Sequence, residues 1–304
     1  MQRRVRKLTG GIALLGVLSL AGSSPAAESK TAADGTTEAS ADEPLPWRWR
    51  RHHWLDYAAS AALVGAGLAA ELTPHDGPPG WVGPALFDTE ARDALVLGSF
   101  DDRKAAARAS DVTLGVLVAK PVLVDAILVT WLGYGAGDTA WQLVAMDLEV
   151  LAFNFAFTGA VKRLADRERP GGTACRTEPG YDRRCEDQSS HNSFFSGHTS
   201  WSFTAAALTC THHARLGLFG VAGDTLACVG TTFGAATVAV ERIVADRHYA
   251  TDVIVGATAG IASGALLPWA LFFAHEAGDE QTLTWQAVPW SPAGGAGLAL
   301  TGLW

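Results

Sequence analysis

Residues 252–274 read DVIVGATAGIASGALLPWALFFA, an apolar run whose one charged residue, Asp252, stands at its start. Ala, Leu, Val and Gly dominate the run, and it lacks the alternation of polar and apolar residues that marks a half-buried strand. A helix of this length can cross the hydrocarbon core of a bilayer, which needs about 20 apolar residues. The run therefore predicts a long apolar helix that is able to span a membrane.

Upstream stretches share this character, and short polar joints separate them. They are residues 57–72, 111–134, 139–161, 199–216 and 219–241. Four prolines interrupt residues 73–88, which predicts a loop, and the charged residues 90–109 suit an amphipathic surface helix. The sequence thus predicts an all-α fold, a bundle of about six apolar helices.

Charges inside these stretches bear on the environment of the bundle. Lys120, Asp125, Asp147 and Glu149 lie within two of the predicted helices. A charge inside a bilayer is costly and must face the interior of a helix bundle. The alternative is a helical bundle in an aqueous compartment, with these charges on its wet face. We expect a membrane-embedded bundle, and a mean hydropathy of +0.14 is compatible with polar segments diluting apolar helices.

Composition excludes some classes of protein. The chain has 304 residues, and 23 Lys and Arg against 31 Asp and Glu give a net charge of −8. This balance argues against a nucleic-acid partner, which a basic face would bind. Four cysteines are too few for a scaffold built on disulfides.

The two ends of the chain differ in composition from the apolar helices. A basic start, a short apolar run and small residues predict a signal peptide at 1–26, with an uncleaved anchor as the alternative. Residues 27–45 are polar and predict a flexible tether. The helical domain is expected at 46–275. Residues 276–304 form a tail in which a Ser-Pro-Ala-Gly-Gly turn between two short runs suits a small β-hairpin.

A basic motif, KRLADRERP, occupies residues 162–170. Lys162 and Arg169 are seven residues apart, so a helix would place them on one face. Pro170 ends that helix. Taken alone, the motif also fits a solvated basic helix end.

A second motif, Ser196-Gly197-His198, leads directly into the predicted helix 199–216. Free backbone N–H groups at a helix start bind anions, and a glycine lets a ligand approach the backbone closely. An ordinary serine cap with a structural histidine is the alternative interpretation of this motif.

A third motif contains Arg242, His248 and Asp252. The histidine and the aspartate are four residues apart, a spacing that allows the carboxylate to accept one ring N–H. The other ring nitrogen would then be free to act as a nucleophile. A His/Asp pair on a helix surface would show the same spacing.

The joint pattern K-x6-R-P, S-G-H and R-x5-H-x3-D resembles the signature of the type 2 phosphatidic acid phosphatase and vanadium haloperoxidase superfamily. The resemblance covers about residues 110–275, the motif core. Phe195 stands where this family usually has Pro, and Glu241 stands where Ser usually precedes the arginine. Neither replaced residue has the main chemical role, so we expect the family's activity with a locally altered pocket.

The resemblance implies a phosphate site in this chain. Lys162, Arg169 and Arg242 would hold the phosphoryl oxygens, and Ser196 with the Gly197 N–H would complete the cradle. Arginine suits this task because its planar fork donates two hydrogen bonds at once.

The resemblance also implies the catalytic roles. His248 would attack phosphorus and form a phosphohistidine, and Asp252 would orient its ring. His198 would protonate the leaving alcohol and then activate water. Because the cations are side chains, we expect neither a metal nor a cofactor.

The function expected from this resemblance is a phosphatase that acts on a lipid phosphate or diphosphate at the membrane. Its location would be a bacterial-type cell envelope, with the active site facing the periplasm or the exterior. The alternatives are a soluble periplasmic acid phosphatase acting on small phosphoesters, a vanadate-dependent haloperoxidase, and a non-catalytic phosphate-binding membrane protein. The oligomeric state stays open.

The state of the cysteines depends on the compartment of the cell in which the protein resides. Cys175 and Cys185 flank a short loop between the first two motifs, so in an exported protein we expect them to pair, with two free thiols as the alternative. Cys210 and Cys228 lie in apolar helices and are expected as core residues.

Topology gives a further expectation. A cleaved signal and an outward-facing site cannot both hold if residues 57–72 cross the membrane. These 16 residues are therefore expected not to cross, with Trp47, Trp49 and Trp54 as interfacial anchors. The pair His212-His213, at the far end of the helix 199–216, is expected at the interface without carboxylate partners.

Overall fold

The structure, a computed structural model, describes part of the chain. The described residues are 45–74, 77–178, 180, 181, 185, 191–276, 284–290 and 297–303. The predicted signal peptide and nearly all of the predicted tether lie outside these residues.

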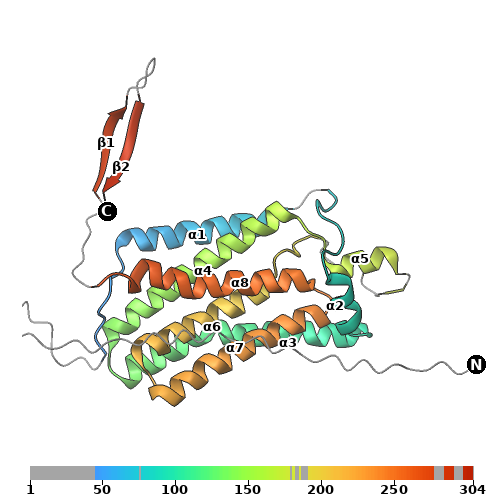
Figure 1. Cartoon of the computed structure of the whole chain (residues 1–304), viewed down its shortest axis with the longest axis horizontal. Coiled ribbons are helices and arrows are strands. Elements are labelled where there is room, and N and C mark those ends of the chain that lie inside the picture. Colours follow the sequence, from blue (N-terminus) through green and yellow to red (C-terminus); the bar gives the residue numbers. More distant parts are fainter. Residues whose placement is uncertain are drawn as a thin grey trace, which may run out of the picture. The chain divides into compact units, whose positions relative to one another are not determined.

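Long helices running side by side form a bundle (Figure 1). They are α1 (Trp54–Leu72), α3 (Phe100–Ala119), α4 (Gly137–Ala165), α6 (Gly197–Leu216), α7 (Gly220–Val244) and α8 (Ala250–Pro268). Two π-helical segments, η1 (Lys120–Gly133) and η3 (Trp269–Phe273), directly continue α3 and α8. The short helices α2 (Asp88–Leu95) and α5 (Pro170–Thr177) lie at one end of the bundle. The all-α prediction is confirmed.

Helix α6 is the centre of the packing and contacts α3, α4, α7 and α8. Its closest neighbour is α8, because three glycines of α8 face α6. A Cβ atom added at Gly256, Gly260 or Gly264 would lie 2.7, 2.3 or 2.4 Å from a backbone oxygen of α6. Real Cβ atoms do not approach backbone oxygens so closely, and only glycine permits this contact between the two helices.

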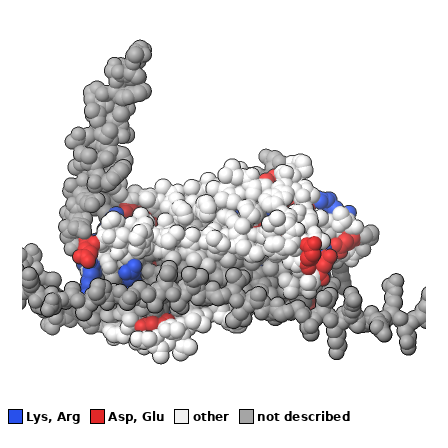
Figure 2. Space-filling model, in the orientation of Figure 1, with Lys and Arg blue, Asp and Glu red and all other residues white. Residues whose placement is uncertain are grey.

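The outer surface of the bundle is that of a membrane protein. The segments Trp54–Leu72, Phe100–Gly133, Gly137–Ala165, Gly220–Val244 and Ala250–Phe273 are each long and apolar enough to cross a bilayer. Large apolar side chains are exposed on them, and Figure 2 shows the charges gathered mainly at the two ends of the face in view. Such an exposed apolar belt is expected where lipid, and not water, surrounds a protein.

Charges inside the helices are buried and paired. Nζ of Lys120 donates to both oxygens of Asp125 at 2.8 and 2.9 Å. Asp147 accepts from Nε2 of His212 at 2.9 Å, and both side chains are fully buried. The structure thus does not support the alternative of a bundle with these charges on a water-exposed face. The charges face the bundle interior, as a bilayer requires.

Three local predictions were wrong. His212 and His213 are buried, and His213 contacts Asp224 through Nδ1 at 2.6 Å, so both histidines have carboxylate partners. Trp47 is buried against Phe273, with ring centroids 5.8 Å apart, and is not an interfacial anchor.

Helix boundaries also correct the sequence analysis. Helix α1 has 19 residues, three more than predicted, which removes short length as a reason to keep it out of the membrane. The segment predicted as one amphipathic helix, 90–109, is broken between α2 and α3. Oγ of Ser99 accepts the N–H of Asp102 at 3.1 Å and caps the start of α3.

Disulfides join two pairs of elements. Cys175 and Cys185 are bonded, with their Cα atoms 5.5 Å apart. Cys210 of α6 and Cys228 of α7 are also bonded, a pairing that the sequence analysis did not predict. The helices α6 and α7 form an antiparallel pair across a short turn, and this brings residues 18 apart in sequence together.

The C-terminal segment contains two strands, β1 (Thr284–Trp290) and β2 (Gly297–Leu303). They pair antiparallel, with Thr284 opposite Leu303 and Trp290 opposite Gly297. This arrangement is the hairpin that the turn-forming residues between them allow.

Candidate active site

The three motifs meet at the end of the bundle that carries α2 and α5 (Figure 1). Lys162 is near the end of α4, His198 is in the first turn of α6, Arg242 is near the end of α7, and Asp252 is in the first turn of α8. His248 lies in the connection between α7 and α8. Antiparallel packing of α4, α6, α7 and α8 thus gathers residues that are up to 90 positions apart in sequence.

His248 is buried, and a backbone carbonyl holds its ring. Nδ1 lies 2.8 Å from the carbonyl oxygen of Ser193, which makes Nδ1 the protonated nitrogen and leaves Nε2 without a proton. Burial, together with the positive charges of Arg242, Arg169 and Lys162, lowers the pKa of His248 well below its usual value. The imidazole is therefore neutral at physiological pH, the state that a nucleophile needs.

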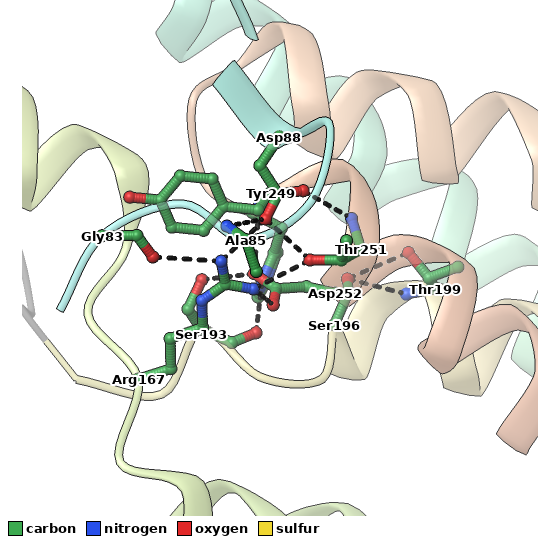
Figure 3. Close-up of polar contacts among 11 residues, drawn as sticks. Gly83, Ala85, Asp88, Arg167, Ser193, Ser196, Thr199, Tyr249, Thr251 and Asp252 are labelled. Atoms are coloured by element: carbon green, nitrogen blue, oxygen red, sulfur yellow. Dashed lines mark hydrogen bonds and ion pairs between the residues drawn. The ribbon is translucent and has the colours of Figure 1, made fainter. Parts of the chain in front are cut away.

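Asp252 does not accept the ring N–H directly. Its Oδ2 is 3.9 Å from Nδ1 of His248, beyond hydrogen-bond distance. Oδ2 instead accepts from Oγ of Ser193 at 2.6 Å and from the N–H of Tyr249 at 3.0 Å. The aspartate thus fixes Ser193 (Figure 3), and the carbonyl of Ser193 orients the histidine. This differs from the direct contact expected from the i,i+4 spacing.

Arg167 is the other partner of Asp252. Its Nη1 donates to Oδ1 of Asp252 at 2.5 Å, and its Nη2 donates to Oδ2 of Asp88 at 2.7 Å. All three side chains are fully buried. The guanidinium lies between the rings of Trp81 and Tyr249, with its central carbon 4.0 and 4.1 Å from their centroids. Two carboxylates therefore pair with the positive charge of Arg167, and an aromatic ring covers each face of its guanidinium. Arg167 is thus a structural group and not a free phosphate ligand.

Asp88 links α2 to α8. Its carboxylate accepts the N–H of Thr251 at 2.9 Å and the N–H of Ala85 at 2.9 Å (Figure 3). Burial would raise the pKa of Asp88, but the hydrogen bonds from Thr251, Arg167 and Ala85 outweigh it and hold the pKa below its usual value. A charged Asp88 thus anchors the loop 77–87 to the site.

Positive side chains surround the free face of His248. Among the described residues, Lys162 and Arg169 have no carboxylate within ion-pair distance, and the buried Nε of Arg169 and of Arg242 lacks a hydrogen-bond partner. Burial and the nearby charge of Arg247 lower the pKa of Arg169 to about 10. Unpaired cations held close together are costly unless an anion joins them. The arrangement suits a phosphoryl group.

Ser196 and Gly197 begin α6. In the structure Oγ of Ser196 is buried and accepts from the hydroxyl of Thr199 at 2.9 Å, so it acts as a helix cap. A Cβ atom at Gly197 would lie 3.2 Å from Nζ of Lys162. Glycine therefore leaves room for the lysine beside the positive end of the helix dipole, where an anion is favoured.

His198 contacts an acidic residue that the sequence analysis did not include in the site. Nε2 of His198 lies 2.8 Å from Oδ1 of Asp111 in α3, and Nη1 of Arg242 lies 3.5 Å from the same oxygen. Burial and the charge of Arg242 lower the pKa of His198 to about 4, although the hydrogen bond to Asp111 opposes them. A bound phosphate would add negative charge here and raise that pKa.

Comparisons with known proteins agree with this geometry. A family model described as the PAP2 superfamily matches residues 144–276, which include both histidines and all three cations of the cradle. Residues 144–276 of the chain are therefore similar to the PAP2 superfamily. The matched segment begins within α4, later than the start of the motif core predicted from the sequence. No solved structure matches the chain.

A curated relative of this chain is the lipid A 1-phosphatase of Porphyromonas gingivalis. The two are 31% identical over 156 residues. These residues are 50% of this chain and 30% of that protein, so the chain spans about a third of the length of the relative it matches.

Proposed function

We propose that the chain is a membrane phosphatase that hydrolyses a lipid phosphate or diphosphate. The observation that supports it best is the neutral His248, with Nδ1 held by a carbonyl and Nε2 free, beside Lys162, Arg169 and Arg242. A nucleophile next to gathered positive side chains is what phosphoryl transfer needs. The apolar belt of the bundle and the lipid A 1-phosphatase relative favour a lipid substrate.

The first half of the reaction transfers the phosphoryl group to the enzyme. Nε2 of His248 forms a bond to phosphorus while the bond from phosphorus to the leaving oxygen breaks. His198 gives a proton to that oxygen, so the product leaves as an alcohol, or as a phosphate monoester where the substrate is a diphosphate.

The second half releases inorganic phosphate. His198, now neutral, takes a proton from a water molecule that attacks phosphorus. The bond between phosphorus and Nε2 breaks, and its electron pair returns to His248. Lys162, Arg169 and Arg242 hold the three equatorial oxygens throughout, where charge spreads in the transition state.

The positive charge in this mechanism comes from side chains, so we propose that no metal takes part. The gathered donors support this, because ammonium and guanidinium groups repel a divalent cation. Hydrolysis that persists in EDTA is the expected result, and loss of activity in EDTA would contradict it.

We propose that the site faces the exterior of the cell. The Cys175–Cys185 disulfide lies between the first two motifs, beside the site, and disulfides persist in oxidising compartments. Val82, in the loop near the site, is half exposed. A cysteine introduced there, V82C, should react with a membrane-impermeant maleimide in intact cells or spheroplasts, whereas labelling only after lysis would place the site inside.

The decisive experiment is phosphate release by the purified membrane protein. The substrates are phosphatidic acid, an isoprenyl diphosphate, a glycolipid carrying phosphate on its sugar, and para-nitrophenyl phosphate. We expect hydrolysis of at least one lipid, its loss in His248→Ala, and an acid-labile, base-stable phosphoenzyme from labelled substrate in the wild type. His248→Ala with near-normal turnover would overturn the nucleophile assignment.

The same preparation separates the alternatives. Turnover of para-nitrophenyl phosphate alone, from a protein in the soluble fraction, would favour an acid phosphatase. Bromination that requires vanadate and peroxide would favour a haloperoxidase. Phosphate binding without any turnover would favour a binding protein.

A further inference from the structure

An apolar groove of about 590 Å³ runs between α4 and α8. Its α4 wall contains Phe153, Phe157 and Val161, and its α8 wall contains Val255, Ala259 and Ala262. None of the side chains that line it is charged. Val255 and Leu266 are exposed, so the groove opens on the outer, apolar surface of the bundle.

One end of this α4–α8 groove adjoins the candidate active site. Val161 directly precedes Lys162, and Phe195 directly precedes Ser196. Val255 lies less than one helical turn beyond Asp252 on α8. The groove therefore begins where the phosphate cradle ends, and it continues along the helix axes away from the cradle.

Aromatic rings line the site end of the groove as a ladder. The ring centroids of Phe153 and Phe157 are 5.7 Å apart, and those of Phe157 and Phe195 are 5.6 Å apart. The ladder continues through Phe194 to Trp81, whose ring covers Arg167. Phe195 is almost fully buried, so packing fixes its ring without a ligand.

Helix α8 determines how far the groove extends from the candidate active site. From Val255 to Leu267 the helix rises about 18 Å. A lipid bound by its phosphate at the end of the bundle would extend its chain in the same direction, along the helices and into the bilayer. The length of the groove, its apolar walls and its position next to the cradle thus suit the hydrocarbon chain of such a lipid.

We propose that the α4–α8 groove binds the hydrocarbon chain of the phosphate substrate and selects it by length. This inference rests on the proposed lipid phosphatase activity and adds to it the residues that recognise the chain. The Phe ladder holds the part of the chain nearest the phosphate, and the small residues of α8 leave room for the rest.

A second groove provides the control. It has a volume of about 530 Å³, lies on the other side of α8 against α6 and α7, and is lined by Ala265, Cys210 and Thr232 among others. No residue of this second groove neighbours a motif residue in sequence. Ala262 and Ala265 are both half-buried on the same helix, so the same substitution at the two positions tests the two grooves separately.

The experiment measures kcat/KM for phosphatidic acids of increasing acyl length in one detergent, with para-nitrophenyl phosphate as a soluble reference. The variants are Ala259→Trp, Ala262→Trp and the control Ala265→Trp. We expect the ratio of long-chain to soluble activity to fall at least tenfold in the first two and to stay within twofold in the control. Because the two positions differ by about 4.5 Å along the helix, Ala262→Trp should accept longer chains than Ala259→Trp.

Several outcomes would overturn the inference. Equal losses on all chain lengths and on the soluble ester would mean that the tryptophans only disturb the fold. The same fall in Ala265→Trp, or no dependence on chain length in any variant, would mean that bulk lipid fills both grooves. Failure of the proposed function is distinct, because the wild type would then hydrolyse no phosphatidic acid of any chain length.

Discussion

Arg167 and Asp252 form a fully buried ion pair, with Nη1 of the arginine 2.5 Å from Oδ1 of the aspartate. The other oxygen of Asp252 holds the hydroxyl of Ser193, and the carbonyl of Ser193 holds His248. Arg167 therefore acts on the histidine through two intermediates and touches no substrate. It is a positioning residue that joins the end of α4 to the start of α8.

Replacing Arg167 should impair both stability and turnover. Arg167→Gln leaves the carboxylates of Asp88 and Asp252 buried without their cation, a change that typically costs about 3–5 kcal/mol. Misplacement of His248 by a fraction of an ångström should lower kcat by about 10- to 100-fold. The control is Arg215→Gln, because Arg215 is exposed in the last turn of α6, at the end of that helix opposite His198.

The kinetic signature separates positioning from binding. If Arg167 positions the nucleophile, kcat falls in Arg167→Gln while KM stays within a few-fold of the wild type. A large rise in KM with kcat preserved would instead make Arg167 a phosphate ligand, and the assignment would be wrong. Thermal unfolding in detergent gives the stability change on the same samples.

The contact between Asp111 and His198 predicts a change in the pH profile. The hydrogen bond from Asp111 raises the pKa of His198, so Asp111→Asn should lower it. His198 must carry a proton to act as the acid, and the alkaline limb of kcat should therefore move to lower pH. Because both side chains are partly exposed, the shift should be less than about one pH unit.

A matched substitution on the same helix isolates this effect. Asp101 is an exposed carboxylate in the first turn of α3, so Asp101→Asn removes an equal charge without touching His198. The alkaline limb should stay in place in Asp101→Asn. A shift of the limb to higher pH in Asp111→Asn would show that Asp111 does not support the protonated acid.

The buried pair of Asp147 and His212 should matter for stability alone. Asp147→Leu leaves His212 without its 2.9 Å partner, and breaking a buried pair typically costs about 3–5 kcal/mol. The double variant Asp147→Leu/His212→Leu removes both polar groups and should recover part of that loss. Thermal unfolding of the two variants measures the difference.

Activity per folded molecule should not change in either of these variants. The pair lies toward the end of α6 opposite His198, far from the motifs along the helix axis. A loss of kcat in properly folded Asp147→Leu/His212→Leu would mean that this pair is coupled to the site. A double variant less stable than Asp147→Leu would contradict the expectation that removing both buried polar groups recovers part of the lost stability.

The sequence predicted the features that local pattern determines. Apolar length identified the long helices, and the three motifs identified both histidines and the three cations. The contacts that hold these residues were not predicted, because Asp88 and Arg167 are 79 residues apart and meet only when α2 packs against the connection between α4 and α5. The contact of the Ser193 carbonyl with His248 could not be predicted from the sequence, because every residue has a backbone carbonyl.

Helix pairing explains the remaining differences. His212 and His213 looked unpartnered because Asp147 is 65 residues away from His212, on α4. The bond between Cys210 and Cys228 was not predicted, because only the packing of α6 on α7 brings the two residues together. The sequence pattern of a helix indicates which of its faces is apolar. It does not indicate which other helix packs against that face, because this depends on the tertiary structure.

The unpaired cations of the cradle predict opposite effects of one substitution with and without phosphate. Arg169 lies close to other positive side chains, and Arg169→Gln removes part of that repulsion. The melting temperature of Arg169→Gln without ligand should therefore equal or exceed that of the wild type. The wild type should gain about 2.7 kcal/mol when phosphate or vanadate is present at 100 times its Kd.

Arg169→Gln should lose most of this gain, because the anion then lacks one of its three cations. The control Arg215→Gln removes an exposed arginine at the far end of α6, outside the cradle, and should keep the full ligand-induced rise. Thermal unfolding with and without the anion, at constant ionic strength, measures both quantities. An Arg169→Gln protein that melts lower without ligand and keeps its response to phosphate would show that Arg169 supports the fold and not the anion.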